Sequence, residues 1–108
     1  MTRIVSIVVG LLIALPAAAA AQGAAAGQKV FETQKCSLCH SIAGKGNAKG
    51  PLEGVAKKYS AEDLKMWITQ PAEMSKKHKT TRKPPMKSFA SLPPADVDAL
   101  VAYLQTLK

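Results

Sequence analysis

The clearest pattern of apolar and polar positions lies at the C-terminal end of the chain. After Pro94, apolar residues recur every three or four positions. That spacing places them on one face of a helix, and proline is tolerated in the first helical turn. The sequence therefore predicts a buried helix that starts at Pro94, with a stripe made of Val97, Leu100, Val101, Leu104 and Leu107.

Two further segments have helical patterns. Ser60 is a suitable N-cap, acidic residues follow it in the first turn, and Pro71 ends the helix. Residues 24–39 begin with alanines and are also predicted to be helical. Residues 44–54 and 75–85 are predicted loops because the first holds four glycines and the second is polar, basic and ends in proline. No alternating strand pattern or internal repeat occurs, which predicts a single all-α domain.

The N-terminal residues have the pattern of a secretory signal peptide. One positive charge at Arg3 precedes an apolar run over residues 4–15, followed by Pro16 and a tract of alanines. The run is shorter than the roughly 20 residues that a membrane-spanning helix needs. We expect cleavage after Ala21, which gives a signal peptide of residues 1–21 and a mature domain of residues 22–108, exported to the periplasm, soluble and without a transmembrane segment. An uncleaved anchor is the alternative.

Composition and charge narrow the possible partners. The chain has 108 residues, and Lys and Arg outnumber Asp and Glu by 15 to 7, for a formal net charge of +8. A domain this small buries little core and usually needs a disulfide, a metal or a cofactor. An exported basic protein is expected to meet acidic proteins or an anionic membrane surface rather than nucleic acid, since the basic loop lacks interleaved aromatic residues.

The candidate chemistry lies in the stretch Cys36-Ser37-Leu38-Cys39-His40, which contains both cysteines of the chain. Positions i, i+3 and i+4 lie on one face of a helix. Two thiols and an imidazole can therefore be presented together to a porphyrin, the thiols bonding to its vinyl groups and the imidazole to its iron. This C-x-x-C-H spacing is typical of covalent haem c attachment.

Other interpretations of this stretch fit less well. A zinc site needs four ligands, and His78 is the only other histidine. A thioredoxin-like dithiol expects a βαβ context, which the pattern lacks. A structural disulfide is compatible with export but leaves His40 without a role.

The ligand opposite His40 decides between electron transfer and binding of a small molecule at iron. The candidates are Met66, Met74, His78 and Met86. Met66 is expected at the surface, Met74 as a gap-filling residue and His78 as a solvated loop histidine among lysines. Met86 is favoured because the preceding prolines stiffen the backbone. His78 or an open position remain alternatives.

The sequence resembles the class I c-type cytochromes over essentially the whole mature chain. Beyond the C-x-x-C-H stretch, Gly27 and Phe31 resemble the glycine and aromatic residue of the family's N-terminal helix. Leu100 and Tyr103 resemble its contacts on the C-terminal helix, where glycine permits a close crossing. The resemblance implies a small cytochrome c fold, with three to four helices wrapped around one covalently bound haem c.

The resemblance also implies roles for residues around the haem. In Gly50-Pro51-Leu52, the Pro51 carbonyl would accept the other imidazole N–H of His40, and Leu52 would pack on the haem. Tyr59 and Trp67 resemble aromatic residues that reach the haem propionates, although core packing is an equally good explanation of both.

Met86 and Phe89 resemble the family's Met-Pro-x-Phe segment, with one departure. Lys87 stands in place of the proline, and Pro84-Pro85 precede the methionine instead. Residues 76–83 are also more basic than the family leads us to expect. His40 and Met86 are therefore the expected axial ligands, with the geometry of the Met86 loop altered.

The predicted function is a periplasmic one-electron carrier without enzymatic activity, which exchanges electrons with acidic redox proteins such as a membrane-bound oxidase or a periplasmic dehydrogenase. One alternative is an electron-accepting subunit of a larger dehydrogenase or oxidase complex. Another is a five-coordinate haem protein that binds a gas or peroxide. Six basic residues near Met86 are either a docking patch or a solvated loop: Lys76, Lys77, Lys79, Arg82, Lys83 and Lys87.

Overall fold

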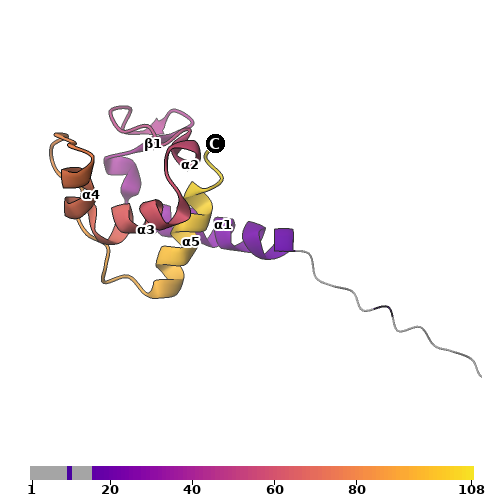
Figure 1. The fold of residues 1–108 in the computed structure, drawn as a ribbon. Helices are drawn as coiled ribbons and strands as arrows, with labels where there is room; N and C mark the ends of the chain where they lie inside the picture. The colour runs from indigo at the N-terminus through magenta and orange to yellow at the C-terminus, as the bar shows by residue number, and fades with distance from the viewer. Residues whose placement is uncertain (1–9, 11–15) are drawn as a thin grey trace, which may run out of the picture.

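A computed structural model describes residues 10 and 16–108 and contains two long helices that cross (Figure 1). Helix α1 spans Pro16–Thr33 and α5 spans Pro94–Leu104. At the crossing, a Cβ atom on Gly27 would overlap the Ala99 carbonyl and would lie 2.6 Å from the Tyr103 Cβ. The expectation that glycine permits a close crossing is therefore confirmed.

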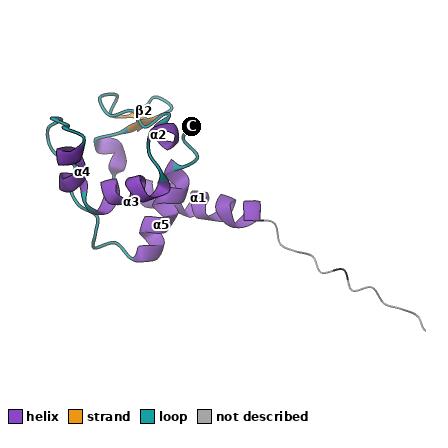
Figure 2. Cartoon of the chain, viewed as in Figure 1, coloured by secondary structure: helices purple, strands orange, loops and turns teal. Residues whose placement is uncertain are grey.

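Shorter elements lie between these helices in the sequence (Figure 2), and the first of them contains the start of the C-x-x-C-H stretch. A 3₁₀ turn, η1, spans Cys36–Leu38, and an antiparallel pair follows with β1 at Ser41–Ile42 and β2 at Lys45–Gly46. Helices α2, α3 and α4 span Val55–Lys58, Ala61–Thr69 and Pro71–Lys77.

The hydrophobic core lies where α1, α3 and α5 meet. Leu64 and Ile68 of α3 are each 2% exposed, and Phe31 of α1 packs edge-to-face on Tyr103, with 5.8 Å between the ring centroids. The predicted apolar stripe faces this core. Leu107, the last residue of the stripe, follows the end of α5 and is only partly buried. The other buried members of the cluster are Val97, Leu100, Val101 and Leu104.

The predicted start of α3 is confirmed. The Ser60 hydroxyl accepts a hydrogen bond from the Asp63 backbone N–H at 3.2 Å. This cap satisfies one of the N–H groups that have no partner within the helix. Leu64 and Ile68 then point inward together because they are four residues apart.

Three predictions about the elements were wrong in detail. The helix predicted over residues 24–39 ends at Thr33, because Lys35 has a positive φ of 56° that an α-helix cannot contain. Pro71 ends α3 and also begins α4, so the loop predicted at residue 75 starts only after Lys77. The predicted glycine-rich loop contains the strand β2, which pairs with β1 just before the loop.

The all-α prediction is confirmed, with five α-helices in the described part of the chain rather than three or four. Within residues 10 and 16–108, no helix has both the length and the hydropathy to cross a membrane. Apart from Gly10, the apolar run at residues 4–15 lies outside the described residues. Helix α1 passes through the expected cleavage position at Gln22 without a break.

Candidate haem site

The C-x-x-C-H stretch forms a tight turn instead of the end of a helix. The Cys36 carbonyl accepts hydrogen bonds from the backbone N–H groups of Cys39, at 3.1 Å, and His40, at 2.9 Å. Both cysteines are free thiols; Cys36 is partly buried and Cys39 is exposed. The turn is a different local structure from the helix that the spacing predicted, and the joint role of the two thiols and the imidazole at a haem remains a prediction.

The His40 ring is oriented by the backbone of the following loop. Its Nδ1 lies 3.1 Å from the Gly50 carbonyl oxygen, which also accepts the Ser41 N–H at 3.0 Å. An Nδ1–H donor leaves the Nε2 lone pair free to bind a metal. The acceptor was expected to be Pro51. It is Gly50, because Ser41 pairs with the loop through the Gly50 carbonyl and the Leu52 N–H.

Burial shifts the pKa values of two residues of the C-x-x-C-H stretch. Burial lowers the pKa of His40 from its usual value, the Gly50 hydrogen bond opposes this shift, and the Arg82 charge adds to it. Burial also raises the pKa of the Cys36 thiol, which the nearby Lys87 charge partly offsets. A neutral imidazole is the form that binds a metal.

Arg82 contacts this site directly, which the sequence did not predict. Its Nη2 donates a hydrogen bond to the Cys39 carbonyl oxygen. Its guanidinium also lies where a Cβ atom on Gly50 would be, so only glycine leaves room for it. Arg82 was expected only as a docking charge, and no signal in the sequence pairs residues 43 positions apart.

Tyr59 and Trp67, the expected propionate partners, lie next to each other. Their ring centroids are 5.9 Å apart, and the Trp67 Nε1 is buried without a hydrogen-bond partner. A buried N–H of this kind costs free energy unless an acceptor satisfies it. A haem propionate is such an acceptor, so the residues present fit a haem.

The segment around Met86 is attached to the C-terminal end of α3. The Phe89 N–H donates to the Ile68 carbonyl at 2.9 Å, and the Ser88 hydroxyl donates to the Thr69 carbonyl at 2.8 Å. Met86 itself is half-buried. These bonds fix the chain after Met86 where the family's proline is replaced by Lys87. The role of Met86 as a ligand remains a prediction.

The other candidate ligands have clear positions. Met66 is exposed, as expected, and Met74 is completely buried on α4, consistent with a gap-filling role. Leu52 is partly buried against the core. His78 is exposed, as expected of a solvated histidine, and its ring also packs on aromatic rings.

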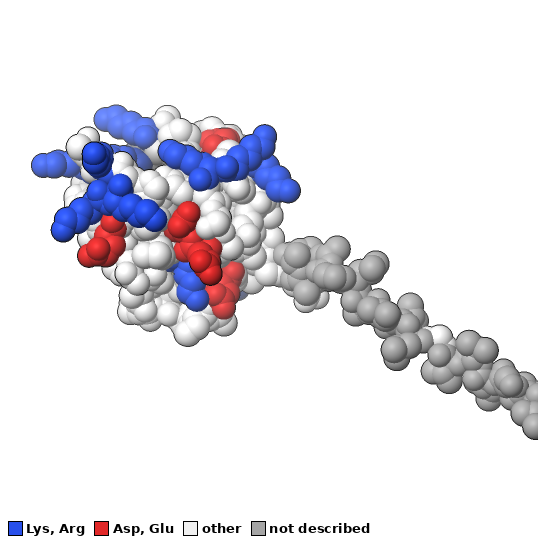
Figure 3. All heavy atoms as spheres, viewed as in Figure 1, with Lys and Arg blue, Asp and Glu red and all other residues white. Residues whose placement is uncertain are grey.

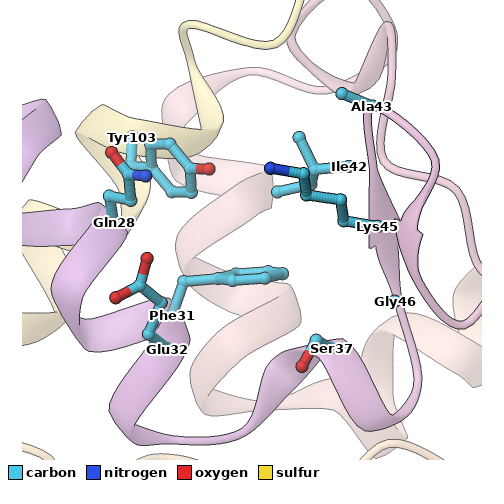
Figure 4. A pocket seen from close by; sticks show the side chains of 9 residues that line it. All are labelled: Gln28, Phe31, Glu32, Ser37, Ile42, Ala43, Lys45, Gly46 and Tyr103. Carbon is cyan, nitrogen blue, oxygen red and sulfur yellow. The ribbon is translucent and has the colours of Figure 1, made fainter.

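A pocket of about 460 Å³ lies elsewhere, between α1, α5 and the β1–β2 pair (Figure 4). Figure 4 shows Phe31 and Tyr103 on one side of it and Ile42 and Lys45 on the other. Neither cysteine, His40 nor Met86 lines this pocket. Ser37 of the C-x-x-C-H stretch does line it, so the pocket borders that turn.

Charge is distributed unevenly over the surface. In the view of Figure 3, basic side chains gather over α4 and the loop after it and at the edge near the β strands, acidic side chains lie over α3 and α5, and smaller acidic areas lie beside both basic groups. We name the six basic residues at positions 76, 77, 79, 82, 83 and 87 the basic patch. All six are exposed.

Comparison with known proteins identifies the family. A family model for cytochrome c matches residues 24–108. The cytochrome c oxidase subunit 2 of Alkalihalophilus pseudofirmus is 31% identical over 91 residues. That match covers 76% of this chain and 25% of the relative, so the chain spans about a quarter of the relative's length. No solved structure gave a significant match.

The match and the fold agree with each other. The family model begins within α1 and continues through α5, so it includes the C-x-x-C-H turn and both helices of the close crossing. The predicted small cytochrome c fold is therefore confirmed. The chain belongs to the cytochrome c family, as a class I c-type cytochrome, and membership in this family implies haem binding and electron transfer between redox partners.

Proposed function

We propose that this chain is a monohaem electron carrier. Cys36 and Cys39 form thioether bonds to one haem c, and His40 and Met86 bind its iron from opposite faces. When bound, the haem supplies a one-electron couple between ferric and ferrous iron. The chain excludes other ligands from the iron, so it carries electrons and is not an enzyme.

The observation that carries this proposal is the hydrogen bond between the His40 Nδ1 and the Gly50 carbonyl. It holds the imidazole with Nε2 free, in the turn that also presents both free thiols. A zinc site is a poor fit, because the described residues contain no cluster of three or more potential metal-binding side chains of His, Cys, Asp or Glu.

Met86 is the proposed second ligand because of how its segment is held. Pro84-Pro85 restrict the backbone before it, and the bonds of Ser88 and Phe89 to α3 restrict the backbone after it. Restraint on both sides lowers the entropy lost when a thioether binds iron. Methionine ligation also raises the reduction potential relative to bis-histidine ligation.

A second candidate function follows from the similarity to an oxidase subunit. In that case the domain passes electrons within a stable complex and does not diffuse between partners. Purification of the native protein under mild conditions distinguishes the two functions. A stoichiometric partner that stays bound through size-exclusion chromatography supports the subunit, and elution as a monomer supports the free carrier.

The proposed location is the periplasm, after removal of residues 1–21. The charged residue at position 3, the apolar run and the alanine tract support this proposal. Mass spectrometry of the purified native protein tests it. A mature N-terminus at or within a few residues of Gln22 is expected, and an intact N-terminal segment contradicts the proposal.

Optical spectroscopy tests the ligand set. The protein is produced with the cytochrome c maturation machinery and measured in ferric and ferrous states, with and without carbon monoxide. We expect a ferric thioether-to-iron charge-transfer band and a ferrous spectrum that carbon monoxide does not change. Binding of carbon monoxide at neutral pH without that band would show an open site and would favour a gas-binding or peroxidatic protein.

A further inference from the structure

One residue outside the turn that bears the cysteines bonds to most of its carbonyl groups. Asn47 follows strand β2, and its backbone N–H donates to the carbonyl oxygens of Ser37, at 3.0 Å, and His40, at 3.1 Å. Its side-chain Nδ2 donates to the Leu38 carbonyl at 3.1 Å. Asn47 therefore bonds to three of the five backbone carbonyls in the C-x-x-C-H stretch.

The same residue also holds the group that orients the imidazole. The Asn47 carbonyl accepts a hydrogen bond from the Gly50 N–H at 3.1 Å. The Gly50 carbonyl in turn accepts the Ser41 N–H and faces the His40 Nδ1. Asn47 thus connects the turn, on one side, to the acceptor of the His40 ring, on the other.

The side-chain amide of Asn47 has one orientation that satisfies both of its ends. Its Oδ1 accepts the Lys49 N–H at 3.0 Å, while its Nδ2 faces the Leu38 carbonyl. The reverse orientation would point an oxygen at a carbonyl oxygen and an NH₂ group at an N–H donor. An ionised aspartate has no donor, so it can replace only the acceptor half of this side chain.

The residue before Asn47 allows its backbone to come this close to the turn. Gly46 has a positive φ of 105°, and a Cβ atom there would overlap the His40 carbonyl oxygen. Residues with a side chain rarely adopt such a conformation. Glycine therefore permits the approach, and asparagine makes the hydrogen bonds.

We propose that Asn47 is a positioning residue of the haem site. Its backbone and side-chain N–H donors hold the turn that presents Cys36 and Cys39, and its carbonyl holds Gly50 where it faces the His40 Nδ1. The direction of the imidazole relative to the two thiols then depends on Asn47. This inference rests on the proposed function, because the three side chains must be aligned only if one haem bonds to all of them.

Loss of the Nδ2 donor has a local consequence. In Asn47→Asp an oxygen would face the Leu38 carbonyl, and in Asn47→Ala that carbonyl would lose this donor. Loss of one net hydrogen bond changes an opening equilibrium roughly two- to tenfold. A looser Gly50 carbonyl also makes the imidazole a less basic ligand. Ferric iron is then stabilised less, so the reduction potential is expected to rise.

The experiment measures hydrogen exchange in the haem-loaded protein by NMR, since exchange reports local and global opening separately. The site protons are the N–H groups of Ser41 and Gly50 and the Nδ1–H of His40, which are bonded around the Gly50 peptide. The reference protons are the backbone N–H groups of Leu100 and Val101, which are buried on α5. The ratio of the two exchange rates is the result.

The variants are Asn47→Asp, which keeps the Oδ1 acceptor, and Asn47→Ala. Ser60→Ala is the matched control, because it removes another hydrogen bond between a side chain and the backbone, at the start of α3. The reduction potential and the ferric charge-transfer band are recorded for each protein. The fraction of chains that carry covalent haem is measured by mass spectrometry.

Both Asn47 variants are expected to exchange the site protons roughly two- to tenfold faster relative to the reference protons. Both are also expected to have a higher reduction potential than the wild type, and aspartate is expected to be no better than alanine. Ser60→Ala is expected to change neither the ratio nor the potential. A lower haem content in the Asn47 variants, with a normal content in Ser60→Ala, also supports the proposal.

Other outcomes overturn the proposal. If the Asn47 variants speed the exchange of site and reference protons equally, Asn47 contributes only to overall stability. If Asn47→Asp keeps the wild-type ratio, the Nδ2 donor does not hold the turn. An equal loss of haem in all three variants also contradicts a specific role for Asn47. Absence of the charge-transfer band in the wild type contradicts the proposed ligand set instead, and the exchange ratio still tests Asn47.

Discussion

At the scale of single residues, the site divides into positions that the motif reveals and positions that only the fold reveals. The spacing of Cys36, Cys39 and His40 is the signal that predicts covalent haem attachment, and their role stays a prediction. The Gly50 carbonyl was missed in favour of its neighbour, because the acceptor depends on how residue 41 pairs with the loop. The contacts of Arg82 and His78 could not be predicted, since they depend on where a long loop lies in space.

Replacement of Met86 tests the ligand assignment at this scale. Met86→Ala is expected to abolish the ferric charge-transfer band and to let carbon monoxide bind the ferrous protein, because the iron loses its thioether. The matched control is Met74→Leu, at the completely buried methionine of α4. This swap nearly conserves volume and is expected to keep the band while costing less than about 1.5 kcal/mol of stability. Loss of the band in the Met74 variant alone would mean that the two methionines have been assigned the wrong way round.

At the scale of elements, the helices with a regular apolar stripe were predicted well and the others were not. The starts of α3 and α5 follow from a capping serine and a first-turn proline. The sequence pattern does not predict helix α4, because Pro71 indicates the end of the preceding helix. Proline at the first position also suits the start of a helix, and α4 begins there. The end of α1 depends on the left-handed backbone of Lys35, which its side chain does not indicate.

The crossing of α1 and α5 gives a prediction with an internal control. Gly27→Ala is expected to destabilise the haem-loaded protein by about 2–3 kcal/mol, because the added methyl group would overlap the Ala99 carbonyl and force the helices apart. Gly23→Ala, on the same helix, places its Cβ 3.5 Å from the Ala102 Cβ, an ordinary contact. That change is expected to be neutral or to stabilise by up to about 1 kcal/mol, because alanine favours helix.

Urea unfolding followed by far-ultraviolet circular dichroism measures both changes. Equal stability of the two variants would contradict the close crossing as the reason for glycine at position 27.

At the scale of the whole molecule, the sequence predicted the family and the net charge but not the arrangement of that charge. Positive side chains gather over α4 and its loop, where they outnumber the acidic ones, and acidic side chains also lie over α3 and α5 (Figure 3). Two members of the basic patch also contact the site, Arg82 through the Cys39 carbonyl and Lys87 through the Phe89 ring. The patch is therefore continuous with the site.

This arrangement predicts how electron exchange responds to salt. The rate of exchange with an acidic redox protein is expected to fall as ionic strength rises, because screening weakens long-range attraction. The double variant Lys76→Gln/Lys77→Gln is expected to react more slowly at low salt and to show a shallower salt dependence than the wild type. Lys45→Gln/Lys49→Gln, which removes the same charge near the β strands, is the control. Equal rates for the two double variants at low salt would show that net charge, and not the patch, steers association.

The shared use of the Gly50 carbonyl has a consequence for how the protein matures. The same oxygen accepts a hydrogen bond from the Ser41 N–H, and this bond pairs two backbone segments. The oxygen also faces the His40 Nδ1, and this contact orients the imidazole ring. The pairing of those segments therefore also sets the direction of the imidazole. The polypeptide would then offer its histidine to an arriving porphyrin in a defined orientation, and attachment of the cofactor would stabilise an arrangement that the backbone pairing had already started.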